Sequence, residues 1–211
     1  MRNFHFHKII FVSFFLFISI KVFSQRFNAG ITGGAIASQV SGDELAGYNK
    51  SGFEIGGLVS IALSEKFDLA FQIAYIQKGS RKPINADQLF YDYYKLRLGY
   101  IQVPFLLKYN FSKKIMFEAG MGIATLLSSS EEDNYGIIPE NNRPPFRKIE
   151  LTTMGTMGYE LFDNFLLLFG IENSVLPIRK YEPGFTHLHL DQYNTLLRFS
   201  FRYYFKKKHE T

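Results

Sequence analysis

The sequence contains no cysteine and no tryptophan, and after its first 24 residues it contains no long apolar run. Without cysteine there are no disulfide bonds, no thiolate metal sites and no lipidated N-terminal cysteine. No segment after Ser24 approaches the run of about 18 apolar residues that a transmembrane helix requires, so no helical span is expected there. Aromatic residues are abundant instead, at 17% of the chain, all of them phenylalanine or tyrosine.

Residues 1–24 have the pattern of a secretory signal peptide. Arg2 and Lys8 precede an apolar run from Ile9 to Ile20, which is too short to cross a bilayer, and we expect cleavage after Ser24. Removal of this segment takes three of the 24 basic residues and leaves 21 against 19 acidic ones, a net charge of +2. The basic composition of the whole chain is therefore no argument for a nucleic-acid partner.

Residues 25–211 form one predicted domain in which large apolar residues recur at every second position. Between Tyr193 and Phe205, for example, Phe199 and Phe201 alternate with Arg198 and Arg202. Side chains of a strand point to opposite faces with period two, so this alternation indicates strands with one apolar face. We place eight of them, at Phe27–Gln39, Gly52–Leu63, Leu69–Gly79, Lys95–Phe111, Ile115–Leu127, Lys148–Glu160, Phe165–Ser174 and Tyr193–Phe205.

The predicted connections alternate between short and long. Three short turns (64–68, 112–114 and 161–164) separate four long polar loops (40–51, 80–94, 128–147 and 175–192). This is typical of an outer-membrane barrel, and it places both chain ends on the periplasmic side. The fold expected is all-β, an eight-stranded antiparallel transmembrane β-barrel. A soluble β-sandwich or a secreted calyx is the alternative, but either would turn the apolar face inward.

The segment Tyr100-Ile101-Gln102-Val103-Pro104-Phe105-Leu106-Leu107-Lys108-Tyr109 resembles the PorT-like outer-membrane β-barrel family of Bacteroidota. The family stretch reads tyrosine, aliphatic, glutamate, aliphatic, proline, three aliphatics and lysine, so the motif residues are Tyr100, Gln102, Pro104 and Lys108, with Gln102 in place of the usual acid. The glycine-rich first strand and the terminal Arg202-Tyr203-Tyr204-Phe205 also fit. The resemblance implies an outer-membrane barrel and no catalytic motif. Mid-strand, Pro104 also predicts a bulge or an interruption of the ladder.

Charged residues of both signs fall on the predicted inner face of the barrel. Two interpretations remain open: these residues line a pore or ligand site, or they pair across a filled lumen, as buried charges must. We expect Arg198 and Arg202 to bridge to glutamates, with Glu172 on the adjacent strand as the first candidate. The residues of this predicted interior network are Glu54, Lys108, Glu118, Glu160, Glu172, Arg198 and Arg202.

The long loops carry weaker signals. His187 and His189 have a spacing that suits zinc or copper, and the run from Glu131 to Asn134 is acidic but lacks the spacing of a calcium loop, so both are expected to be solvated. Loop aromatics would indicate partner binding if they formed one exposed strip. These are Phe90, Tyr91, Tyr93, Tyr94, Tyr135, Phe146 and Phe185.

The sequence therefore predicts a non-enzymatic integral outer-membrane protein without a cofactor, acting as a structural or binding component of an envelope or secretion assembly. The expected partners are outer-membrane lipids, the barrel-insertion machinery that reads a terminal aromatic such as Phe205, and an envelope protein bound through external loops. A narrow passage for small solutes and a barrel enzyme with a site at the membrane rim are the alternatives.

Overall fold

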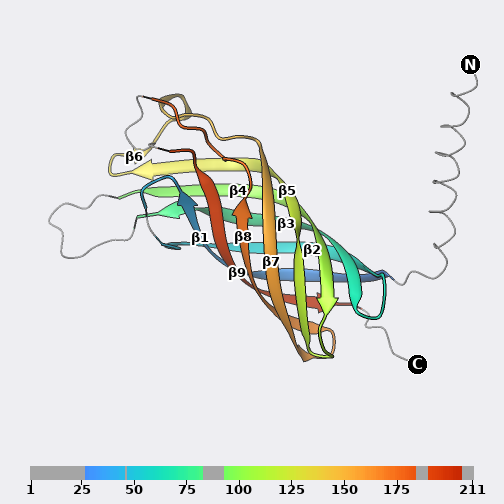
Figure 1. Cartoon of the computed structure of the whole chain (residues 1–211). Helices are drawn as coiled ribbons and strands as arrows, with labels where there is room; N and C mark the ends of the chain where they lie inside the picture. The colour runs from blue at the N-terminus through green and yellow to red at the C-terminus, as the bar shows by residue number, and fades with distance from the viewer. Residues whose placement is uncertain (1–26, 46, 83–92, 184–189, 206–211) are drawn as a thin grey trace, which may run out of the picture.

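The computed structural model describes residues 27–45, 47–82, 93–183 and 190–205. Eight long strands make up most of this part of the chain (Figure 1). A two-residue strand, β6 (Gly136–Ile137), and a single 3-10 turn, η1 (Glu140–Asn142), lie between β5 and β7. The long strands are β1 (Phe27–Ser41), β2 (Lys50–Ala62), β3 (Phe67–Arg81), β4 (Lys95–Asn110), β5 (Ile115–Asp133), β7 (Ile149–Phe162), β8 (Phe165–Ser174) and β9 (Tyr193–Tyr204).

The eight strands close into an antiparallel barrel. Each pairs with its sequence neighbour, and β1 and β9 complete the ring through a ladder from Gly30↔Tyr204 to Ser41↔Tyr193. A closed ring leaves no strand edge unpaired along the wall, which is the requirement for a sheet in hydrocarbon. The predicted eight-stranded antiparallel barrel is therefore confirmed.

All eight predicted strands are present, and two of them, β3 and β5, are longer than expected by four residues or more. β3 extends to Arg81, and β5 extends six residues beyond the predicted end at Leu127. Residues 128–132, expected to be loop, instead pair with the first residues of β4. The sequence misled here because Ser128–Asp133 is polar on both faces, so the alternation that identified the membrane part of the strand is missing.

The two faces of the wall are as predicted. Phe199 and Phe201 are exposed on the outside, whereas Arg198 and Arg202 are buried inside. On β3 the outward apolar residues run from Phe67 to Tyr75, nine residues of strand, which is close to the span of about 9–11 needed by a tilted transmembrane strand. We call this belt of outward apolar residues the apolar band.

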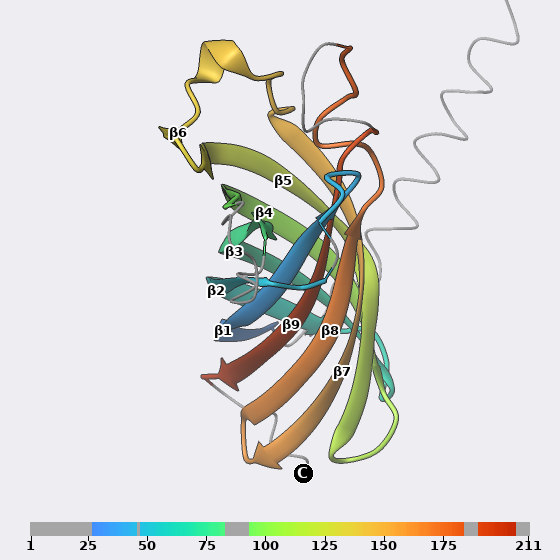
Figure 2. The same ribbon diagram turned by 90° about the vertical axis from the view of Figure 1, so that its left-hand side faces the viewer.

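The two ends of the barrel differ. At the short-turn end, Ser64 and Ser112 accept hydrogen bonds from the backbone amides two and three residues further on, which stabilises the turns after β2 and β4. Asn164 closes the turn after β7 with a positive φ of 67°. The described parts of the long connections, together with β6 and η1, lie at the opposite, long-loop end (Figure 2).

Pro104 interrupts one ladder without shifting its register. The β3–β4 pairing stops after Phe71↔Phe105 and resumes at Ala74↔Gln102 with the same register, while Pro104 still pairs with Gly122 of β5. The sequence left open a bulge or an interruption, and the structure has an interruption. A β-bulge lies elsewhere in the β4–β5 ladder, where Gly99 and Tyr100 pair with Ser128 and Leu126, and Leu127 of β5 is the extra residue.

Several predictions fall on residues that the structure does not describe, among them the signal peptide and both loop histidines. Within the described residues, no helix is long and apolar enough to cross a membrane. Phe205 lies just beyond the end of β9, and its amide donates to the Ala29 carbonyl at 2.9 Å.

Candidate functional site

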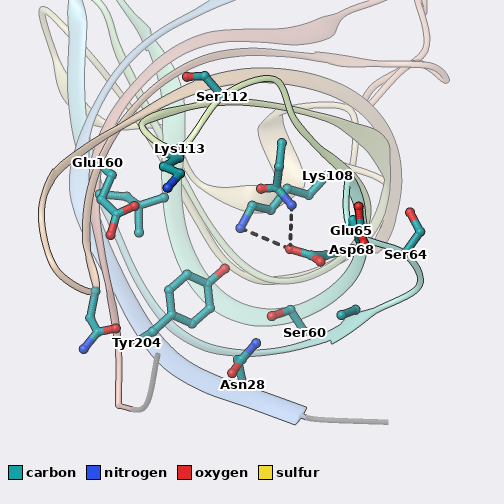
Figure 3. Close-up of a pocket in the computed structure, with 14 residues that line it drawn as sticks. Asn28, Ser60, Ser64, Glu65, Asp68, Lys108, Ser112, Lys113, Glu160 and Tyr204 are labelled. Atoms are coloured by element: carbon teal, nitrogen blue, oxygen red, sulfur yellow. Dashed lines mark hydrogen bonds and ion pairs between the residues drawn. The ribbon is translucent and has the colours of Figure 1, made fainter. Parts of the chain in front are cut away.

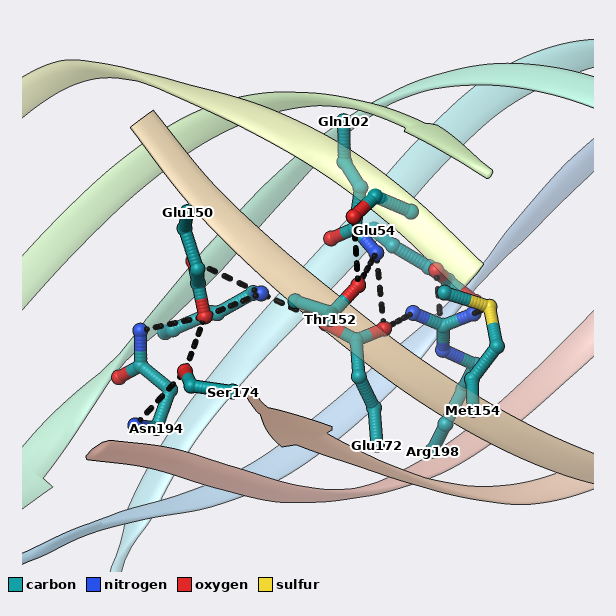
Figure 4. A network of polar contacts seen from close by, with 11 residues as sticks. Glu54, Gln102, Glu150, Thr152, Met154, Glu172, Ser174, Asn194 and Arg198 are labelled. Atoms are coloured by element: carbon teal, nitrogen blue, oxygen red, sulfur yellow. Dashed lines mark hydrogen bonds and ion pairs between the residues drawn. The ribbon is translucent and has the colours of Figure 1, made fainter. Parts of the chain in front are cut away.

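Glu172 is at the centre of a buried network that spans the lumen (Figure 4). Its Oε2 accepts from Arg198 Nη2 at 2.6 Å, and its Oε1 lies 2.6 Å from Lys78 Nζ. Arg198 also reaches Glu54 of β2, with Nε 3.3 Å from Oε2. These residues come from β8, β9, β3 and β2, so the contacts connect different sides of the wall.

The network continues from Lys78 toward the long-loop end through Glu150 of β7. Lys78 Nζ lies 3.2 Å from Glu150 Oε2. The other carboxylate oxygen of Glu150 accepts from Ser174 Oγ at 2.6 Å and from Asn194 Nδ2 at 3.1 Å. Lys78 and Glu150 were not among the predicted interior residues. Both nevertheless occupy positions of β3 and β7 whose side chains alternate toward the inside of the barrel.

Gln102, the motif position at which the resembling family has an acid, faces this network. Its amide nitrogen donates to Glu172 Oε2 at 2.9 Å and to Thr152 Oγ1 at 3.3 Å. A carboxylate at position 102 would place a second negative charge against Glu172 with no proton to donate. An amide at this position therefore fits the network, because it donates the hydrogen bond that Glu172 accepts.

A second ion pair lies closer to the short-turn end. The two terminal guanidinium nitrogens of Arg202, Nη1 and Nη2, donate to the Glu118 carboxylate, with Nη2 3.1 Å from Oε2. Both side chains are almost completely buried. Glu118 is on β5, which is not a neighbour of β9 in the sheet, so this pair crosses the lumen. Glutamates do bridge to both arginines, but only Arg198 has its partner on the adjacent strand.

Apolar side chains fill the lumen between and beyond these ionic layers. Leu58, Met116, Leu166, Leu168 and Tyr204 form a cluster toward the short-turn end. A larger cluster toward the long-loop end includes Ile76, Tyr100 and Leu196. The interior of this narrow barrel is thus occupied by its own side chains, as expected for eight strands.

The two remaining predicted network residues, Lys108 and Glu160, lie at the short-turn mouth rather than in the central layers. Lys108 Nζ is 3.2 Å from Asp68 Oδ2, on the neighbouring strand β3. Both residues border an open polar cavity of about 330 Å³, together with Asn110 and Tyr204 (Figure 3). The alternation of residues correctly predicted that both side chains face the inside of the barrel, but it could not predict their position along the barrel axis.

At the long-loop end a second buried cluster, which we call the outer closure, forms around Glu131. The Glu131 carboxylate accepts from Tyr94 Oη at 2.6 Å, from Arg179 Nη2 at 2.6 Å and from Arg143 Nη1 at 3.2 Å. The guanidinium carbon of Arg179 lies 3.6 Å from the centroid of the Phe146 ring, within the range of a cation–π contact. Three separate connections are thereby joined to the end of β5.

The outer closure corrects two expectations. Glu131 was expected in a solvated acidic loop, but it is buried within a strand and its charge is paired. Tyr94 and Phe146 were two candidates for an exposed aromatic strip, but both turn toward this cluster and do not contribute to one. Burial, together with the adjacent Glu131 carboxylate, raises the pKa of the Tyr94 phenol.

The chemistry available to these clusters is charge pairing. Each buried carboxylate described above is bonded to a guanidinium, an ammonium or a hydroxyl group. Within the described ranges, no group of three or more His, Asp or Glu side chains is arranged to hold a metal ion. His187 and His189 lie outside those ranges.

A small closed barrel with a filled polar lumen and an outward apolar band is the class of protein defined by these observations. Residues 23–178 match the family model described as the outer membrane protein beta-barrel domain. The chain belongs to this family, and its location is the outer membrane.

Solved structures with a similar chain path come from other small outer-membrane barrels. They include Ail, the attachment invasion locus protein of Yersinia pestis (13% identity, covering 84% of this chain and 98% of that chain, TM-score 0.49). The neisserial surface protein A has 12% identity, with 85% and 98% covered and a TM-score of 0.48. OprG from Pseudomonas aeruginosa has 12% identity, with 87% and 98% covered and a TM-score of 0.43. No curated protein sequence matches the chain significantly.

Proposed function

We propose that this protein is a non-conducting, non-enzymatic barrel that serves as a binding or structural component of an envelope assembly, in the manner of the PorT-like proteins it resembles. The filled lumen is the observation that carries the proposal. Lys78, Gln102, Glu150 and Glu172 are each 1% exposed or less, and they lie across the space that a solute would have to cross. The outer closure adds a second barrier at the long-loop end.

The long-loop end also offers a surface for a partner. Tyr135 and Ile137, at the hairpin between β5 and β6, are 99% and 73% exposed. They lie well beyond the apolar band, so contact with lipid does not account for them. We infer that this hairpin, and not the broad aromatic strip, is the part of the external surface that meets another envelope protein.

Conductance measurements test the closed lumen. The purified barrel is expected to give no steady single-channel conductance in planar lipid bilayers. Arg179→Ala and Glu131→Ala, which remove the outer closure, should also remain non-conducting because the central network still blocks the lumen. Steady openings of the unaltered barrel would instead favour solute passage.

Crosslinking in intact cells tests the binding role. A photoreactive amino acid at position 137 should give one defined adduct with another envelope protein. The same group at Phe169, on the lipid-facing side of β8, is the matched control and should give none. If position 137 yields no protein adduct, or the same adducts as position 169, the hairpin is not a docking site.

A further inference from the structure

Three cationic side chains gather on the outer face of the wall at the long-loop end of β3 and β4, and we call them the basic rim cluster. They are Arg81, Lys95 and Arg97. Arg81 stands directly opposite Lys95 in the β3–β4 ladder, and Arg97 is two residues further along the same face of β4. Like charges directly opposite one another destabilise a sheet, so this arrangement needs a compensating anion.

Lys50 of β2 is a further cation near the cluster, but it occupies an inward position of the wall and is only 4% exposed. Its Nζ donates to the Ser51 carbonyl at 2.5 Å and lies 3.5 Å from Gln77 Oε1. The positive charges of Lys95, Arg97 and Arg81 all act on this ammonium group. Because Lys50 is buried, its ammonium group adds to the positive potential behind the cluster but is not itself exposed to a ligand.

One carboxylate among the described residues pairs with the cluster. Glu132 Oε1 lies 2.9 Å from Arg97 Nη2, and Glu132 is also opposite Lys95 in the β4–β5 ladder. Counted over the residues that the structure describes, the three cations of the cluster and this one carboxylate leave a local excess of two positive charges. The Arg97 side chain remains 43% exposed, so a ligand can reach its guanidinium from outside.

The cluster lies immediately beyond the apolar band, on the outer face of the wall. On β4 the outward residues change from Ile101 to Gly99 and then to Arg97, and on β3 they change from Tyr75 to Gln77 and then to Arg81. Leu96 and Leu98, on either side of Arg97, are fully buried, which shows that Lys95 and Arg97 face outward. With the apolar band in hydrocarbon, these cations are at the level of the lipid headgroups.

We propose that the basic rim cluster binds a phosphate-bearing lipid headgroup of the outer leaflet. A phosphate group supplies close to two negative charges and several acceptor oxygens, which matches the charge excess and the planar donors of two arginines. Long arginine and lysine side chains can extend along the wall toward the phosphate while their stems stay against apolar surface. This inference is independent of the proposed protein-binding role.

Lipid binding to the purified full barrel in a neutral detergent tests the proposal, with native mass spectrometry as the readout. The probes are diphosphorylated lipid A and the same glycolipid without its phosphates. The unaltered barrel should bind the phosphorylated form about tenfold more tightly or better. The double variant Arg81→Gln with Lys95→Gln should lose this preference, and Lys113→Gln with Lys114→Gln, in a turn at the opposite end, should keep it.

Folding of each variant is checked by the gel shift on heating. Because Arg81 and Lys95 repel each other, their replacement should leave the lipid-free barrel at least as heat-stable as before. Arg97→Gln alone provides a second test, with a smaller loss of preference, if the double variant does not fold.

Four results would overturn the proposal. The first is equal binding of the two glycolipids, and the second is a preference that survives in the Arg81 and Lys95 variant. The third is a preference that appears only after Asp87→Asn with Asp92→Asn, because chain carboxylates would then be the natural counter-ions. Displacement of the lipid by inorganic phosphate at equal concentration would point to a soluble anion as the source and would also count against it.

Discussion

Arg198 and Glu172 form a diagonal ion pair inside the barrel, with Nη2 of the arginine 2.6 Å from Oε2 of the glutamate. In the β8–β9 ladder Arg198 is opposite Gly170, and Glu172 is opposite Leu196. The guanidinium therefore reaches two positions along β8 to the carboxylate. The same guanidinium contacts Glu54, so a single arginine holds two carboxylates on different strands.

Replacement of Arg198 by leucine should lower the heat stability of the barrel in detergent. The substitution leaves Glu54 and Glu172 without their shared cation, and breaking one partner of a buried ion pair typically costs roughly 3–5 kcal/mol. The loss is measured as a lower temperature for the gel shift on heating. Phe199→Leu, one residue along β9 and facing outward, is the control that should change little. Equal melting of the arginine variant and the unaltered barrel would refute the role assigned to this pair.

The Arg202–Glu118 pair should behave differently when both members are replaced together. Arg202→Met or Glu118→Met alone leaves a buried charge unpaired and should destabilise the barrel by roughly 3–5 kcal/mol, whereas the double variant should recover most of this loss. The apolar cluster nearby, which includes Met116 and Leu166, can pack against the new methionines. Urea unfolding in detergent, followed by circular dichroism, gives the three free energies. Additive losses in the double variant would mean that the two residues are not coupled.

Tyr94 should resist ionisation in the folded protein. Its pKa is raised above the ordinary value of 10.0, first by burial and then by the negative charge of Glu131. Because the folded-state pKa exceeds the unfolded one, the contribution of Tyr94 to the outer closure is fully present below about pH 10 and is lost as the pH rises further. Tyrosinate absorbance during alkaline titration measures this. The tyrosinate absorbance that the unaltered barrel shows and Tyr94→Phe lacks should develop only above pH 10. If that absorbance developed with a midpoint at pH 10, the phenol would not be buried.

The alternation of residues predicted the wall of the barrel well, since a period of two is a local property of any strand with one apolar face. It placed Arg198, Glu172 and Glu54 inside and Phe199 outside. The same rule, applied to every inward position of β3 and β7, would also have identified Lys78 and Glu150. It failed for the far part of β5, where polar residues on both faces carry no periodic signal.

The depth of a residue along the barrel was not accessible from the pattern. Lys108 and Arg202 have the same inward parity, but one borders an open mouth and the other lies in a sealed layer. That difference depends on the stagger between strands, which appears only when the sheet closes and its register is set.

The amino-acid sequence by itself determined which side of each strand meets lipid, because every second residue along a strand points the same way. The outer closure was decided by the tertiary structure alone: Tyr94, Glu131, Arg143 and Arg179 come from four separate segments without a shared spacing. They meet because β5 extends beyond the apolar band and presents a buried carboxylate, and a charge removed from water is stable there only when cations from other segments pair with it.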